Sequence, residues 1–310
     1  MSDTTQTLTT TFDDVPAARV RDYVDLLKPR VMSLVVFTGL ISIVIAPGHL
    51  HPFMAALAVL AIALGSGAAG CINMWYERDL DALMARTRNR PLPAGRVAPD
   101  DALALGVLLS LFSVLLMAVS TNFVAAALLA VAILFYVFVY TIWLKPRTPH
   151  NIVIGGAAGA FPPLIGWAAV TGDVSPISIA LFGLVFLWTP PHFWALALFR
   201  SDDYRRAGVP MLPVVAGARE TKRQMLIYTL VLVPVALVPT LMGAVGWLYG
   251  AVALATSLGF VGHAVAVWRT ADDQTGHRAA RRMFRFSLLY LAVLFAALPL
   301  DQLAARILAG

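Results

Sequence analysis

Nine long apolar segments constrain this chain more than any other feature of its sequence. Each holds roughly 20 mostly apolar residues, the length of an α-helix that crosses the hydrocarbon core of a bilayer. Backbone polar groups find no water in that core, so each segment must be helical. Since 59% of the residues are hydrophobic and only 13% are charged, little remains for a soluble domain. The segments are 31–47, 54–76, 102–119, 122–144, 152–170, 175–199, 225–244, 247–268 and 284–303. We expect an all-α polytopic membrane protein with nine transmembrane helices around a central cavity.

The first twenty residues are polar and unlike the rest of the chain. They contain no apolar core of a signal peptide, and Asp3, Asp13 and Asp14 are atypical of an acid-poor transit peptide. We therefore expect a disordered cytoplasmic tail over 1–20 and a single transmembrane domain over 21–310. The lack of an organelle signal favours the inner membrane of a bacterial cell.

The basic residues alternate along the chain. Of the 23 Lys and Arg, all but Arg306 lie before the first segment or in and beside every second loop. By the positive-inside rule, this alternation puts the N-terminus and the basic loops in the cytoplasm and the C-terminus outside. All of the 17 acidic residues except Asp173 and Asp301 fall on the same predicted side.

The second segment ends in an acid cluster, within CINMWYERDLDALMARTRNRP at 71–91. Asn73, Glu77 and Asp81 have i, i+4, i+8 spacing, which places them within about 80° of one another on a helix. Mg²⁺ prefers such hard oxygen ligands and completes its shell with water and substrate phosphates. Arg86 and Arg90 follow, and guanidinium groups suit bidentate phosphate binding.

A second acid cluster follows the sixth segment, where Asp202 and Asp203 stand among arginines. PLPAG at 91–95 is weakly echoed by MLPVVAG at 211–217, four helices later. This echo suggests a parallel internal duplication that brings the two loops together. Either cluster alone is most often a solvated loop end, but two on one side favour a metal-bridged diphosphate site.

The two clusters resemble those of the UbiA-type intramembrane prenyltransferases, which carry N-x-x-x-D-x-x-x-D after the second helix and an aspartate motif after the sixth. Two departures matter. Glu77 stands where that pattern has Asp, and only Asp203, with Asp202 beside it, matches the second motif. The matching runs are DLLKPRVMSLVVFTG at 25–39, NMWYERDLDALMARTRNRPLPAGR at 73–96, TPHNIVIGGAAGAFPPLIGW at 148–167 and WTPPHFWALALFRSDDYRRAGVPMLPVVAG at 188–217.

These runs most closely resemble the members of the family that farnesylate heme. The resemblance implies that the farnesyl group of farnesyl diphosphate is transferred to a vinyl group of heme b with addition of water, giving heme O and diphosphate. It also implies that catalysis uses Mg²⁺, with Arg86 and Arg90 on the diphosphate. The implied metal ligands and catalytic residues are Asn73, Glu77, Asp81 and Asp203. A heme A synthase or a terminal oxidase is a candidate downstream partner, and no nucleic acid is expected.

His192 is an ionisable residue inside the sixth segment and therefore a functional candidate. Pro190 and Pro191 precede it and are expected to kink the helix and free a backbone carbonyl. Two interpretations stay open: His192 contacts or ligates heme, or it is a neutral histidine that bonds this carbonyl. Tyr76 and Tyr204 are the rings nearest the clusters for shielding an allylic cation.

Three further predictions concern the helix ends and packing. Lys28, before the first segment, is expected to pair with heme propionates or, more commonly, lipid phosphates. The pair Pro162–Pro163 is expected to break the fifth helix. Gly155 and Gly159 have the small-xxx-small spacing that allows close helix packing.

Three rival functions remain compatible with the residues. A prenyltransferase for a quinone precursor would use the same diphosphate site and differ only in the acceptor pocket. A transporter of an anionic amphiphile would need a second gate, but the loops on the opposite side lack Lys and Arg. An assembly factor for an oxidase would leave the spacing of Asn73, Glu77 and Asp81 unexplained.

Overall fold

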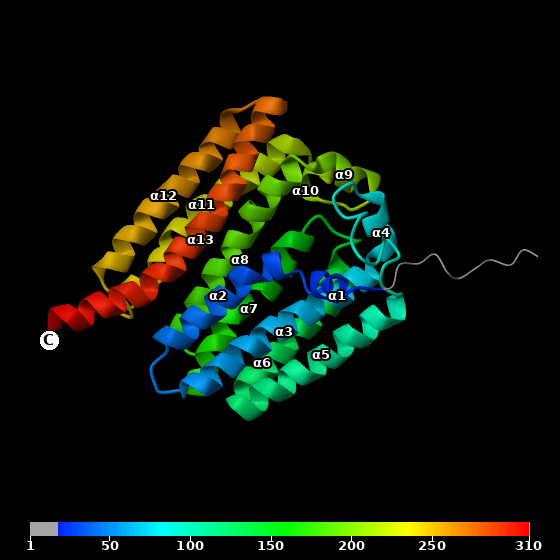
Figure 1. Cartoon of the computed structure of the whole chain (residues 1–310). Coiled ribbons are helices and arrows are strands. Elements are labelled where there is room, and N and C mark those ends of the chain that lie inside the picture. Colours follow the sequence, from blue (N-terminus) through cyan, green and yellow to red (C-terminus); the bar gives the residue numbers. More distant parts are fainter. Residues whose placement is uncertain (1–17, 310) are drawn as a thin grey trace, which may run out of the picture.

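The computed structural model describes residues 18–309, and every regular element in this range is a helix (Figure 1). The predicted all-α class is confirmed. Residues 1–17 of the predicted tail lie outside the described residues, and Val20 already begins a helix. The elements are α1 (Val20–Leu26), α2 (Pro29–Ile45), α3 (Pro52–Tyr76), α4 (Arg78–Leu83), α5 (Pro99–Ser120), α6 (Phe123–Leu134), η2 (Phe135–Leu144), α7 (Asn151–Thr171), α8 (Pro176–Leu198), α9 (Ser201–Arg206), α10 (Leu212–Val215), α11 (Gly217–Leu241), α12 (Trp247–Arg269) and α13 (Gln274–Ala309).

Eight helices of the described chain are long and apolar enough to cross a membrane, with α6 and η2 forming one continuous span. The bent pair α1–α2, with 55° between its helices, brings the total to nine if it counts as one span. The predicted nine spans agree with that upper count. α11 begins at Gly217 instead of residue 225, because its first polar turns continue the same helix beyond the apolar stretch.

The break between α1 and α2 falls at Lys28, the only non-glycine residue with a positive φ in the described chain (φ 53°, ψ 52°). Pro29 follows it at the first helical position, where a proline starts a helix well and also disfavours the α conformation of its predecessor. A left-handed non-glycine residue costs of the order of 1–3 kcal/mol. The surrounding structure must stabilise it, and the contacts of its side chain are described below.

The spans pack as two groups that share α2 and α7. One buried core joins α3, α5 and α6 to these two helices, and the other joins α8, α11, α12 and α13 to them. At the shared contact, a Cβ on Gly166 of α7 would lie 2.2 Å from the carbonyl oxygen of Gly39 on α2. The two helices therefore touch through their backbones, as small residues permit inside membranes.

The short helices α4 and α9 lie side by side at one end of the bundle, and the C-terminus lies at the other (Figure 1). Met84 and Leu80 pack in one apolar cluster with Tyr204 and Val209. This contact confirms the prediction that the loops after the second and sixth segments come together. We call this end, with α4, α9 and the arginine-rich start of α13, the basic end.

The predicted break of the fifth helix is wrong. α7 runs unbroken through Pro162 and Pro163, both of which are buried, and α8 likewise continues through Pro190 and Pro191. Prolines are tolerated in membrane helices because neighbouring helices and small local adjustments satisfy the freed backbone groups.

Candidate active site

The first acid cluster begins on the last turn of α3 and continues into α4. The amide of Glu77 donates to the carbonyl of Asn73 at 3.0 Å, and the amide of Asp81 donates to the carbonyl of Glu77 at 2.7 Å. These i→i−4 bonds keep the three residues on one helical face, so the predicted spacing holds in the structure. All three side chains are buried.

The amide of Asn73 is held in one orientation by two partners. Its Nδ2 donates to Oγ1 of Thr141 at 3.1 Å, and that hydroxyl uses its single hydrogen on the carbonyl of Tyr136 at 2.8 Å. Its Oδ1 therefore points the other way and accepts from Nζ of Lys28 at 2.7 Å. The strained backbone of Lys28 thus delivers an ammonium group to the site, and its pairing with propionates or lipid phosphates stays a prediction.

The helix that faces this cluster is partly a π-helix. The bond from Thr141 to Tyr136 spans five residues, as does the backbone bond from Lys145 to Tyr140. Single π-helical segments are frequent at functional sites because they change which side chains share a face. Here Thr141 and Lys145 both reach the first acid cluster.

Glu77 is paired with Lys145, whose Nζ lies 2.5 Å from the carboxylate. Burial alone would lower the pKa of Lys145, but the charge of Glu77 and the hydrogen bond to it outweigh burial and raise that pKa above its usual value. The ammonium group therefore stays charged at neutral pH. It also lies 6.0 Å from the centroid of the Tyr140 ring, a cation–π distance.

Asp81 is the most deeply buried member of the cluster, with 1% of its surface exposed. Nη1 of Arg90 donates to its Oδ2 at 2.6 Å, and Thr87 donates to its backbone carbonyl at 2.8 Å. The loop after α4 therefore folds back to return a guanidinium to the carboxylate. Arg86 on the same loop is exposed, and its side chain has no hydrogen-bond partner among residues 18–309, so the structure brings only one of the two predicted arginines onto an acid.

Asp203 is the buried acid of the second cluster, on the six-residue helix α9. It contacts the guanidinium of Arg206 and lies 3.7 Å from that of Arg200. Asp202 points to solvent, where its carboxylate accepts from Arg205 at 2.7 Å. The prediction that singled out Asp203 therefore fits the burial of the two acids.

The four predicted metal ligands fit Mg²⁺ by the chemistry of their atoms, since all are hard oxygen donors: three carboxylates, shared between two clusters, and one amide. Each is at present held by an ammonium or guanidinium group. Within residues 18–309, no three His, Cys, Asp or Glu side chains are grouped so as to hold a metal ion. Asn73 falls outside that set of residue types, and the basic partners would have to give way when a cation binds.

Two aromatic predictions have different outcomes. Tyr204 is buried and packs in one cluster with Met84, whereas Tyr76 is 42% exposed. Tyr140, which the sequence did not single out, is the aromatic ring beside Lys145 at the first acid cluster, the position expected for Tyr76. A Cβ on Gly155 would lie 2.1 Å from the Tyr140 ring, so this glycine allows the close packing predicted for it, while Gly159 faces open space.

Lys145 and Tyr140 carry little signal in the sequence. Lys145 is the first cation after an apolar span. A basic residue at that place is also expected from membrane topology alone, so it does not point to a site. The spacing of five residues between the two matches no face of an α-helix, and only the π-helical turn aligns them with the site.

His192 is buried in an aromatic sandwich. Its ring stacks at 4.4 Å on Trp188 and at 4.7 Å on Phe284. Its Nδ1 lies 2.6 Å from Oγ of Ser287, whose single hydrogen is already donated to the carbonyl of Phe284 at 2.7 Å. Nδ1 is therefore the protonated nitrogen and Nε2 carries a lone pair. The predicted bond to a freed backbone carbonyl is wrong, because a hydroxyl takes that role.

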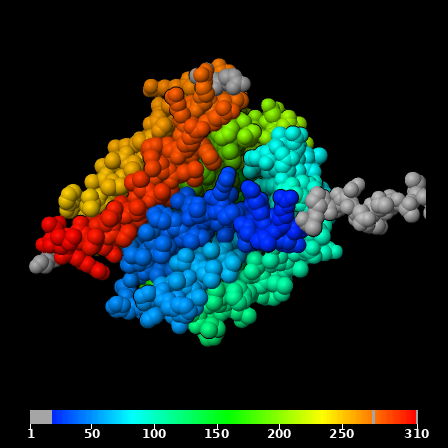
Figure 2. Space-filling model, viewed as in Figure 1, coloured from blue at the N-terminus to red at the C-terminus, as the bar shows by residue number. Residues whose placement is uncertain are grey.

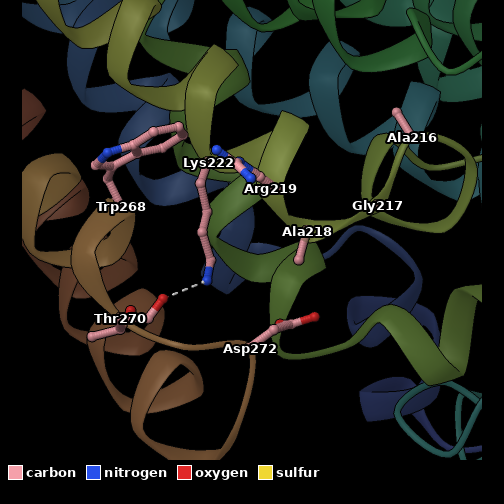
Figure 3. Close-up of a pocket in the computed structure, with 8 residues that line it drawn as sticks. All are labelled: Ala216, Gly217, Ala218, Arg219, Lys222, Trp268, Thr270 and Asp272. Carbon is pink, nitrogen blue, oxygen red and sulfur yellow. Dashed lines mark hydrogen bonds between the residues drawn. The ribbon is translucent and has the colours of Figure 1, made fainter.

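A cavity of about 580 Å³ lies apart from both acid clusters, between the start of α11 and the loop after α12 (Figure 3). Lys222 reaches into it and donates to the carbonyls of Thr270 at 3.0 Å and Ala271 at 3.4 Å. Both carbonyls belong to the residues directly after α12, which ends at Arg269, so this lysine caps the C-terminal end of that helix. No predicted site residue lines this cavity, and its visible chemistry is that of a helix cap.

A family model described as the UbiA prenyltransferase family matches residues 35–289. The chain belongs to the UbiA prenyltransferase family.

Relatives within that family carry a more specific name. The chain is 55% identical over 306 residues to the protoheme IX farnesyltransferase of Parvibaculum lavamentivorans, covering 98% of this chain and 96% of that protein. It is 58% identical over 290 residues to the protoheme IX farnesyltransferase of Afipia carboxidovorans, covering 94% and 93%. These relatives confirm the resemblance to the heme-farnesylating members.

Solved structures with low sequence identity share the fold. A structure from work on digeranylgeranylglyceryl phosphate synthase matches with a TM-score of 0.74 at 16% identity, covering 91% of this chain and 97% of that one. A UbiA homologue from Archaeoglobus fulgidus, bound to GPP and Mg²⁺, matches with a TM-score of 0.65 at 18% identity, covering 89% and 99%.

Proposed function

We propose that this protein transfers the farnesyl group of farnesyl diphosphate to a vinyl group of heme b, with addition of water, giving heme O and diphosphate. The observation that carries the proposal is the set of four buried oxygen-bearing side chains, each held by a cation, at one end of the bundle. The names of its relatives support heme as the acceptor.

We assign the metal site to the two clusters. The proposed Mg²⁺ ligands are Asn73, Glu77, Asp81 and Asp203. When bound, Mg²⁺ stabilises the negative charge that develops on the leaving diphosphate. The Archaeoglobus fulgidus homologue, which was solved with GPP and Mg²⁺, supports this assignment by the shared fold.

The basic partners of the acids have a second role in this scheme. Lys28, Arg90 and Lys145 each lie within hydrogen-bond distance of a proposed ligand, so they are close enough to turn to the diphosphate when it arrives. Arg86, which has no partner in the described chain, joins them. Preorganised cations of this kind stabilise charge that develops in the transition state.

The reaction then follows from the substrates. The bond between farnesyl C1 and the bridging oxygen breaks, and its electron pair leaves with diphosphate, giving an allylic cation. The vinyl π electrons form the new carbon–carbon bond, water adds to the resulting cation, and a proton is lost. The rings of Tyr140 and Tyr204 lie beside the clusters and shield the allylic cation by cation–π contact.

His192 is proposed to contact the heme acceptor through Nε2. The Nδ1–H bond to Ser287 fixes the tautomer in which Nε2 is unprotonated and has a free lone pair. A histidine whose second nitrogen is anchored in this way is oriented to ligate a metal. The farnesyl chain and the porphyrin ring are hydrophobic and fit inside the bilayer. The diphosphate and the propionates are charged and need the polar surface at the membrane boundary.

We place the protein in the inner membrane of a bacterial cell with its active site on the cytoplasmic side. The alternation of Lys and Arg along the chain supports this orientation. A heme A synthase or a terminal oxidase is then the candidate consumer of the product.

The test uses membranes that contain the full chain, incubated with heme b, farnesyl diphosphate and Mg²⁺. We expect heme O, detected by mass after pigment extraction, and its loss with EDTA or in Asp81→Asn. Asp202→Asn, which changes an exposed acid beside the site, is the matched control and should retain activity. Release of diphosphate with a phenolic acceptor, but not with heme, would replace heme by a quinone precursor.

A further inference from the structure

We infer that Arg281 binds a propionate of the heme acceptor and thereby fixes which edge of the porphyrin lies at the start of α13. The inference rests on the proposed function and adds a residue that selects and orients the acceptor. It starts from a continuous line of stacked groups between α8 and α13.

The line runs from His192 to the basic end. The His192 ring stacks on Phe284 of α13 at 4.7 Å, and Phe284 meets Phe199 edge-on at 6.2 Å. The guanidinium carbon of Arg281 lies 5.3 Å from the centroid of Phe199. The groups alternate between the two helices: His192 of α8 and Phe199 directly after it contact Phe284 and Arg281 of α13.

The buried imidazole of His192 and the exposed guanidinium of Arg281 are separated along the helix axes. Phe199 lies seven residues after His192, which is about 10 Å along a helix axis. Arg281 lies one turn before Phe284, toward the same basic end. A porphyrin whose iron is near His192 extends over a comparable distance, so its carboxylate edge reaches the guanidinium.

Arg281 differs from the other arginines at the start of α13. Arg282 lines a separate groove with Gly262 and His263 of α12. Arg281 alone in the described part of α13 has its guanidinium over a ring of α8, and it forms no ion pair there. Its charge is therefore available to a carboxylate, while the ring fixes its position.

The surface offers an approach to this line. Figure 2 shows a hollow where the orange start of α13, the blue α1–α2 pair and the cyan loop after α3 approach one another, with green residues at its floor. The porphyrin carries its propionates on one edge and its vinyl groups on the other. Because the iron lies between the two edges, binding a propionate at the start of α13 places the vinyl edge beyond His192, deeper in the bundle than Arg281.

The experiment titrates purified full-length protein in detergent with heme b and, separately, with heme dimethyl ester, whose propionates carry no charge. The Soret band reports binding to wild type, Arg281→Gln, Arg281→Lys and the control Arg282→Gln. A charge-assisted hydrogen bond contributes about 1.5–3 kcal/mol, so we expect Arg281→Gln to weaken heme b binding at least about tenfold. The affinity for the ester should not change, and Arg281→Lys should restore part of the affinity for heme b.

Three outcomes bear on the inference separately from the proposed function. Equal weakening of both ligands in Arg281→Gln would show a structural role and overturn it, as would unchanged affinity for heme b. In the farnesylation assay, Arg281→Gln should raise KM for heme and leave KM for farnesyl diphosphate unchanged, which also shows that the variant is folded. If wild type farnesylates no heme, the proposed function fails, whatever the titrations show.

Discussion

The two acid clusters meet at the same end of the bundle but are stabilised in different ways. In the first, Lys28 reaches Asn73 across 45 residues of sequence and Lys145 reaches Glu77 across 68. In the second, the partners of Asp203 are three residues away on the same short helix and lie largely in solvent. The first cluster is thus fixed by tertiary packing and the second by local pairs.

This difference teaches which half of the site is preorganised. Exposed local ion pairs contribute about 0–1 kcal/mol, so α9 can exchange its partners at little cost. Buried pairs between distant elements are held in place by the helices that carry them, so only the charged ends of their side chains can turn. We expect the first cluster to define where the metal and diphosphate sit, and the second to complete the site after substrate arrives.

The largest expected effect is from Asp81→Asn. The change removes a buried charge from the preorganised cluster, and we expect kcat/KM to fall on the order of 10³-fold, as for loss of a key electrostatic group. Heme O formation followed by mass measures it. Activity within tenfold of wild type would mean that the first cluster does not hold the metal.

Lys145→Met should have the next largest effect. It leaves the carboxylate of Glu77 buried without its cation, which should lower the free energy of unfolding by about 3 kcal/mol. We also expect activity to fall roughly 100-fold, because one donor to the diphosphate is lost. Thermal unfolding in detergent and the farnesylation assay measure the two effects.

Two companion variants make the Lys145 result specific. Arg223→Gln removes an exposed cation paired with Glu220 and should leave both measurements near wild type. Combining Lys145→Met with Glu77→Gln should recover stability without activity. If activity also returned, Lys145 would only balance charge.

Asp203→Asn tests the second cluster. Because its ion pairs are local and their arginines are 45% and 60% exposed, we expect little change in stability and a loss of activity of about tenfold, smaller than for Asp81. Asp202→Asn is its neighbour control and should have no effect. A loss as large as that of Asp81→Asn would remove the difference between the clusters.

The smallest expected effect on activity is from Asp301→Asn, at the opposite end of the bundle. This buried acid accepts from the backbone amides of Gly246 and Tyr249, and so caps the start of α12 from another helix. Loss of such a cap costs about 1 kcal/mol. Thermal unfolding should show that decrease while farnesylation stays unchanged.

The sequence predicts most of the fold because hydropathy controls it. Segments of bilayer length with polar ends gave the spans, and the fourth predicted segment, 122–144, differs by one residue from the observed Phe123–Leu144. The failures have local causes. α7 continues through Pro162–Pro163 because its neighbours support it, and the polar start of α11 at Gly217 stays helical beyond the apolar stretch.

The site was predictable only where its residues lie close together in sequence. Asn73, Glu77 and Asp81 fall within two turns of helix, so their spacing reveals a shared face. Lys145 and Tyr140 come from a distant span and from a π-helical turn that ordinary helical periodicity does not describe. The stacking of His192 likewise depends on α13, almost a hundred residues away.

The basic partners of the acids also bear on how such a protein is made. A cluster of naked carboxylates would be costly to move into a membrane before any metal arrived. Arg90 and Lys145 act as built-in counter-ions of Asp81 and Glu77, so the newly inserted chain can complete its folding with both carboxylates paired. A metal ion can later take over the acids while the diphosphate takes over the released cations, so neither set of charges is left without a partner in the bilayer.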